Sequence, residues 1–199
     1  MNKVLIILII FGFYLPVKAQ KLSDLGGAEK VWVLLHPFSG KKAKRKSNQA
    51  KKVSDRVSVT KDWLPINSGG RKDAFRHGIW MSLLSTRIGP KRAIWLGKAH
   101  EKKNKKDFFK RRLEDGEYPD YWAVKMDLYN NRIGSKLVER GDAELNDLID
   151  LVLSCIEKGK FQMIKMDLNG NSLRLDGSIL SKEEWQTIWK SERVLIPTY

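Results

Sequence analysis

The chain has 199 residues, of which 38 are lysine or arginine and 23 are aspartate or glutamate, so its net charge is +15. This length favours one domain with at most a small appendage. The excess of basic residues favours an anionic partner, such as a phospholipid surface, nucleic acid or an envelope polyanion, and does not choose among them. The single cysteine, Cys155, excludes an intramolecular disulfide, so the core has to be stable without one.

The N-terminal residues have the three parts of a secretory signal peptide. Lys3 precedes the apolar run Val4–Leu15, and Val17 and Ala19 occupy the small-residue positions of a cleavage site. The apolar run is shorter than the ~20 residues that a membrane-spanning helix needs. We therefore predict a signal peptide over residues 1–19, with export of the remainder to the periplasm or the extracellular space and no transmembrane segment after cleavage.

Apolar periodicity and capping signals predict a series of helices. The first covers about residues 27–35, and a strongly basic helix follows it, with seven basic residues between Lys41 and Lys52. After a loop, a helix covers about residues 72–87 and ends at Gly89, and Pro90 opens another that runs to about residue 103. The charge-rich segment 102–120 is predicted to be a mobile connection, and helices over about 121–140 and 143–157 follow it.

The pattern changes after residue 160. Residues 161–178 alternate apolar and polar side chains around the turn "NGN", which predicts a β-hairpin. Ser181 and Glu184 form a capping box that opens a short helix over about residues 182–190. The expected fold is therefore mainly α, a helical bundle with a small C-terminal β-hairpin and short helix. Its expected domains are a helical domain over 20–159 and a hairpin–helix appendage over 160–199 that packs on it.

Polar side chains interrupt the apolar faces of three predicted helices. Each of them would cost several kcal/mol if it were buried without a partner, so we expect them to be buried together and to satisfy one another. Clusters of titratable groups mark functional sites more often than they serve stability. The predicted catalytic cluster comprises Asp73, Arg76, His77, His100, Glu101, Asp127, Asn130 and Asn131.

Three sequence motifs pass through this cluster. The runs "DAFRHGIWMSLL", "GPKRAIWLGKAHE" and "MDLYNNRIG" resemble, in order, the R-H-x-x-W, A-H-E and M-D-L-x-N-N-x-x-G motifs of an uncharacterised bacterial domain. That domain occurs in secreted Bacteroidota proteins and at the C-termini of Rhs/WapA-type polymorphic toxins. It has no settled activity, so the resemblance supports the importance of the cluster without assigning roles, and the toxin association favours an enzyme. This chain differs from the toxin context in its own predicted signal peptide.

Two kinds of chemistry are open to such a cluster. In metal-assisted hydrolysis, His77, His100 and Asp127 would bind a divalent ion such as zinc, with Asp73 or Glu101 as a further ligand. In metal-free catalysis, His77 would be the general base, Arg76 would stabilise an oxyanion, and His100 or Glu101 would be the acid. Either favours a phosphodiester substrate in phospholipid or nucleic acid. The alternative is a non-catalytic secreted polyanion- or envelope-binding protein in which the cluster only fixes helix packing.

A basic segment follows the second histidine motif directly. Its seven basic residues face one acid, and Phe108 and Phe109 lie among them, a combination suited to a polyanion or a membrane surface. A charged, solvated face is the alternative interpretation. The predicted docking residues are Lys102, Lys103, Lys105, Lys106, Arg111 and Arg112.

Overall fold

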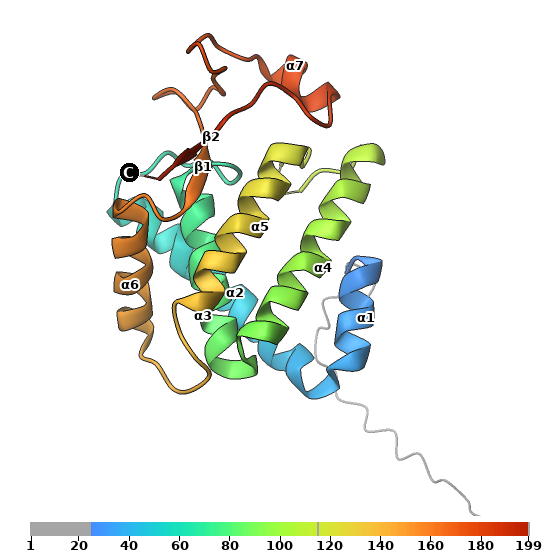
Figure 1. The fold of residues 1–199 in the computed structure, drawn as a ribbon, viewed down its shortest axis with the longest axis vertical. Coiled ribbons are helices and arrows are strands. Elements are labelled where there is room, and N and C mark those ends of the chain that lie inside the picture. Colours follow the sequence, from blue (N-terminus) through green and yellow to red (C-terminus); the bar gives the residue numbers. More distant parts are fainter. Residues whose placement is uncertain (1–24, 115, 199) are drawn as a thin grey trace, which may run out of the picture.

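The computed structural model describes residues 25–114 and 116–198, so the predicted signal peptide lies outside the described residues. The predicted mainly α fold is confirmed (Figure 1). None of the described helices is both long and apolar enough to cross a membrane. The elements are α1 (Gly27–Leu35), α2 (Pro37–Thr60), α3 (Arg71–Ile88), α4 (Pro90–Phe109), α5 (Tyr121–Lys136), α6 (Leu145–Glu157), β1 (Gln162–Ile164), α7 (Lys182–Thr187) and β2 (Leu195–Pro197).

Helix α3 is the centre of the bundle and packs against α2, α4, α5 and α6. One side of α3 shares an apolar core with α2 and α6, in which Phe75 and Ile79 are fully buried. Another side shares a second core with α1 and α4, which contains Trp32 and Leu84. Figure 1 shows α4 and α5 side by side, with α6 at the other edge of the bundle. Polar residues on α3 are therefore enclosed by neighbouring helices.

Helices α3 and α5 approach each other closely because small residues face each other between them. A Cβ atom on Gly134 would lie 2.6 Å from the carbonyl oxygen of Gly78, so no larger residue fits there without movement. At the same contact, Ser82 Oγ donates a hydrogen bond to the Gly134 carbonyl at 3.1 Å. This contact fixes how the side chains one or two turns away on α3 and α5 meet.

Helix α4 is longer than the sequence predicts. It continues to Phe109, so the prediction of a mobile connection is wrong for residues 102–109. Asn104 and Phe108, one turn apart, lie on the buried face of this extension, and the Phe108 ring packs on Trp189 at 5.2 Å between centroids. The sequence does not reveal this buried face, because the cations between the two residues make the segment look polar throughout. These cations lie on the solvent side of the helix. Helix α5, by contrast, ends at Lys136, earlier than the predicted residue 140.

The small antiparallel sheet at the C-terminal end is confirmed, but its second strand differs from the expected one. Strand β1 pairs with β2, with Met163 opposite Ile196. The predicted "NGN" turn does form, since the Asp167 N–H donates to the Asn171 carbonyl at 3.0 Å, but the chain beyond it makes only isolated bridges. β2 is favoured as the partner because Thr198 anchors it through a backbone hydrogen bond to Phe161. Helix α7 begins at the predicted capping box.

Candidate metal centre

Four polar side chains meet where α3 crosses α5. Asp73 and His77 lie one turn apart on α3, and Asp127 and Asn131 lie one turn apart on α5. Because one helical turn places residues i and i+4 on the same face, each helix presents a pair to the other. All four residues are buried.

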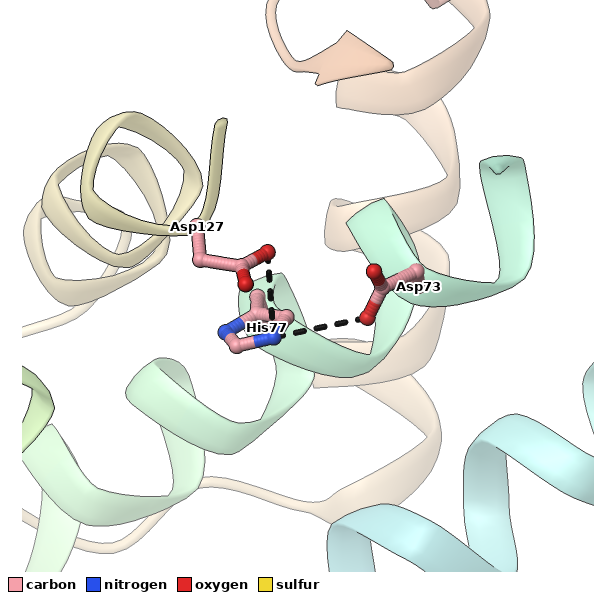
Figure 2. A group of neighbouring side chains, drawn as sticks. All are labelled: Asp73, His77 and Asp127. Carbon is pink, nitrogen blue, oxygen red and sulfur yellow. Dashed lines mark ion pairs between the residues drawn. The ribbon is translucent and has the colours of Figure 1, made fainter. Parts of the chain in front are cut away.

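His77 lies between two carboxylates (Figure 2). Its Nε2 is 3.4 Å from Oδ1 of Asp73 and 3.2 Å from Oδ1 of Asp127. One ligand atom from each of the three residues lies within 4.8 Å of the other two. Their exposed side-chain fractions are 2%, 6% and 9% for Asp73, His77 and Asp127, so the group is almost closed to solvent.

Further hydrogen bonds orient the members of this group. Oδ1 of Asn131 lies 2.9 Å from Nδ1 of His77; an amide oxygen can only accept, so Nδ1 carries a proton and Nε2 faces the carboxylates. Asp73 is held from the other side, because the Gly69 N–H donates to its Oδ2 at 2.7 Å and Arg76 donates to its Oδ1 at 2.6 Å. Histidines that ligate metals commonly donate their second ring N–H in this way.

The charges of the group depend strongly on one another. Burial by itself would lower the pKa of His77, but the carboxylates of Asp127 and Asp73 raise it to about 9. Burial also opposes ionisation of Asp73, yet Arg76 and His77 hold its pKa well below the ordinary value. The pKa of Asp127 is well above its ordinary value, because burial and the charge of Asp73 outweigh the attraction of His77. Without an ion, His77 is therefore an imidazolium at neutral pH.

The three ligand atoms fit a divalent cation. A tetrahedral ion with bonds of about 2.0–2.1 Å has ligand atoms about 3.3 Å apart, close to the two distances from Nε2 of His77. Oδ1 of Asp127 is buried and contacts Nε2 of His77 at 3.2 Å, so a divalent cation bound here would replace the ion pair with the imidazolium. Nitrogen and carboxylate oxygen ligands suit zinc, and three protein ligands leave a position open.

Comparison with known families places this geometry in context. A family model described as a domain of unknown function (DUF6973) matches residues 30–160, more than half of the chain. The chain belongs to the DUF6973 family. Comparisons with curated proteins and with solved structures found no significant match. The matched region of the DUF6973 domain includes α2 to α6 and all residues of the predicted cluster.

His100, the histidine of the A-H-E motif, is not in the group of three ligand residues. Nδ1 of His100 contacts Glu29 of α1 at 3.1 Å, and its Nε2 contacts Glu114 in the segment after α4 at 3.2 Å. Burial by itself would lower the pKa of His100, but these carboxylates raise it well above the ordinary value. Trp80 stands between the histidines, with ring centroids 6.0 Å from His77 and 5.7 Å from His100. The ligand set expected from the sequence therefore differs: Asp73 takes the place of His100.

Glu101 and Asn130 have separate environments. Glu101 is buried, receives a hydrogen bond from Asn104 through one oxygen, and has no partner at the other. Burial raises its pKa to about 7, and the charges of both His77 and His100 act on it. Asn130 points away from His77 and bonds the backbone N–H and carbonyl of Gln162, each at 2.9 Å. Of the eight predicted residues, the structure therefore brings Asp73, Arg76, His77, Asp127 and Asn131 into direct contact.

The predicted docking residues lie at the C-terminal end of α4 and just beyond it. Lys103 is half-buried and pairs with Asp107, one turn further along α4, at 2.8 Å, so it stabilises the end of this helix. Arg111 donates to the Gln186 carbonyl and lies 3.8 Å above the ring of Tyr118. The remaining four are exposed: Lys102, Lys105, Lys106 and Arg112.

Glu29 and Glu114 were not predicted from the sequence. Glu29 lies in the first turn of α1, where an acidic residue is explained by the helix dipole alone. Its pKa is nevertheless lowered, against the effect of burial, by His100 and the Gly26 N–H. Glu114 lies in the segment that the sequence predicts to be a mobile connection. Nothing in the local pattern of either residue indicates a contact with His100.

Proposed function

We propose that this protein is an exported metal-dependent hydrolase that acts on a phosphodiester-containing anionic substrate. The observation that carries the proposal is that one ligand atom each of Asp73, His77 and Asp127 lies within 4.8 Å of the other two, in a group almost closed to solvent. Asp73, His77 and Asp127 would hold the ion, and Asn131 would keep Nε2 of His77 free to bind it. A bound divalent ion would supply a hydroxide nucleophile at neutral pH and polarise a phosphoryl oxygen.

Other residues of the site suit the remaining tasks. The guanidinium of Arg76 contacts Asp73 while 24% of its side chain is exposed, so it is placed to bind a phosphate next to the ion. Glu101, on α4 outside the group of three ligand residues, has a pKa of about 7, raised by burial, and the charges of His77 and His100 act on it, which suits proton transfer to a leaving group. The metal-dependent route is favoured because three ligand atoms converge, and a cation bound to them would displace the proton from Nε2 of His77. In the metal-free route that proton stays, because Asp127 and Asp73 raise the pKa of His77 to about 9, and little neutral imidazole is left to act as a base at neutral pH.

Export and a relation to toxin domains remain parts of the proposal. Export rests on the signal-peptide pattern of residues 1–19, and the toxin relation rests on the three motifs between Asp73 and Gly134. An exported enzyme of this kind would meet nucleic acid or phospholipid outside the cytoplasm.

One observation favours the non-catalytic alternative. The three ligand side chains are at most 9% exposed, so a substrate has little direct access to an ion held between them. A secreted polyanion-binding protein with a structural ion or a structural charge network would have such a closed site.

The test compares metal binding with hydrolysis in the same preparations. Protein freed of metal with a chelator is reloaded with Zn²⁺ or Mn²⁺, and bound metal and hydrolysis of bis(p-nitrophenyl) phosphate are measured. Asp127→Asn should stay folded, lose the metal and lower the rate by about 100-fold or more. The control Asp142→Asn changes an exposed aspartate that pairs with Arg87, and it should change neither the bound metal nor the rate of hydrolysis.

The outcomes separate the two functions. Metal binding together with hydrolysis that Asp127→Asn abolishes supports the hydrolase. Metal binding without hydrolysis of phosphodiesters, including DNA and phospholipid, contradicts it and supports a structural ion in a binding protein. Failure of the unaltered protein to bind either metal refutes the metal centre itself.

A further inference from the structure

A basic groove lies between α2 and the beginning of α6, away from the three ligand residues. Its volume is about 630 Å³. Its lining includes three cations, two side-chain amides and Leu145 of α6, and it contains no acidic residue. The cations are Arg45, Lys52 and Arg56, and the amides are Asn48 and Gln49.

The lining residues form a row along α2. Arg45, Gln49, Lys52 and Arg56 follow one another at intervals of three or four residues, so they share one face of the helix. The rise of an α-helix spreads Arg45 and Arg56 over about 16 Å along the groove. The groove therefore presents positive charges in a line rather than at one point.

Within residues 25–114 and 116–198, no acidic side chain pairs with the cations of this row. Arg45, Lys52 and Arg56 make no ion pair with the residues that the structure describes. Asp55, the single acid of α2, instead binds Lys72 of α3 at 2.8 Å. The pKa of the neighbouring Lys46 is lowered by burial and by the charges of Arg87 and Arg45, as expected where cations crowd together. On the α6 side, exposed Glu144 precedes Leu145 but does not line the groove, whose three cations therefore exceed this one nearby acid.

We infer that this groove binds the phosphodiester backbone of a nucleic-acid strand. A strand carries negative charges at regular intervals, which matches a line of cations, and a guanidinium binds a phosphate through two parallel hydrogen bonds. Asn48 and Gln49 can bond to sugar or base edges between the phosphates. The groove lining itself offers no exposed large apolar side chain for insertion into a lipid surface, because Val53 is buried and Leu145 half-buried. The exposed Phe38 and Val59 of α2 lie outside the lining. The inference does not depend on hydrolysis.

The test is a binding experiment in a chelator, so that no metal-dependent cleavage interferes. Anisotropy of a labelled single strand of about 15 nucleotides is measured over a range of salt concentrations. The triple variant Arg45→Gln, Lys52→Gln, Arg56→Gln should bind about tenfold or more weakly and reduce the slope of log K against log salt by about 2. Lys136→Gln, Lys158→Gln, Lys160→Gln has the same change in net charge at exposed positions outside the groove, and should keep most of the affinity and the slope.

Circular dichroism melts check that both triple variants are folded, which we expect because all six positions are exposed. Equal losses in the two variants would refute the groove and leave only a general effect of charge. Binding to anionic phospholipid vesicles, but not to the oligonucleotide, would also overturn the inference. Because nothing is cleaved in this experiment, its failure is distinguishable from failure of the proposed hydrolase.

Discussion

Asn131 accepts a hydrogen bond from Nδ1 of His77, whereas Asn130 turns toward the backbone of Gln162 at the start of β1. Successive residues of a helix point about 100° apart, so two adjacent asparagines reach different parts of the molecule. Asn131 controls the tautomer of a candidate ligand. Asn130 forms hydrogen bonds with the backbone N–H and carbonyl of Gln162, at the start of β1.

This difference predicts opposite effects of the two alanine variants. Asn131→Ala should weaken Zn²⁺ binding by about 10–100-fold, because it removes the hydrogen bond that orients a ligating histidine. Asn130→Ala should leave Zn²⁺ affinity nearly unchanged and lower the free energy of unfolding by about 2 kcal/mol, because it unpairs backbone groups. Competition with a chromophoric chelator and urea unfolding measure the two quantities. Equal loss of metal affinity in both variants would contradict the roles assigned here.

At the scale of elements, the end of α4 shows how charge can conceal a packed helix. The last two turns alternate exposed lysines with buried Asn104, Asp107 and Phe108. Phe108 is 5% exposed, while the adjacent Phe109 is 63% exposed, although both rings are near Trp189. Only the buried ring contributes substantially to the attachment of the C-terminal segment to α4.

We therefore expect the two phenylalanines to differ sharply on truncation. Phe108→Ala should lower the free energy of unfolding by about 3 kcal/mol, because it leaves a cavity among buried side chains. Phe109→Ala should lower it by about 0.5 kcal/mol or less, because its ring is mostly in water already. Urea unfolding followed by tryptophan fluorescence measures both. If Phe108→Ala left the free energy of unfolding unchanged, the packing of this part of α4 would be contradicted and the predicted mobile connection would be favoured instead.

At the scale of the whole molecule, the bundle encloses several titratable groups among α3, α4 and α5. Burial raises the pKa of Glu101 from 4.5 to about 7, and Asp127 and Asp73 raise that of His77 from 6.5 to about 9. Protonation of a group whose pKa is higher in the folded state stabilises that state. Protonated Glu101 contributes fully to the stability of the fold when the pH is below its unfolded-state pKa, and this contribution is lost as the pH rises through about 7. The contribution of protonated His77 is lost as the pH rises through about 9.

The metal-free protein should therefore become less stable as the pH rises from about 5 to 9. Glu101→Gln imitates the protonated carboxyl and should remove on the order of 2 kcal/mol of this decline between pH 4.5 and 7. Glu139→Gln, at an exposed position, should keep the whole decline. The free energy of unfolding in urea, in a chelator, gives the profile. A stability that rises with pH over this range would refute the assigned charges.

Much of the candidate site was predictable because its pairs are local. Asp73 with His77, and Asp127 with Asn131, follow from the spacing of one helical turn on otherwise apolar faces. The choice between the two histidines was not predictable in this way. His77 and His100 both lie on helices next to small and apolar residues, and their sequences do not say which carboxylates they will meet.

By itself, the sequence determined the helices, their caps at Gly89–Pro90 and Ser181, and the polar character of the seam, because periodicity and capping act over a few residues. Only the tertiary structure decided that Asp73, His77 and Asp127 form one group, whereas His100 contacts Glu29 and Glu114. It also decided that β1 pairs with β2. These contacts join residues far apart in the chain, and the rotation and close approach of the helices, at Gly78 and Gly134 above all, determine which side chains meet.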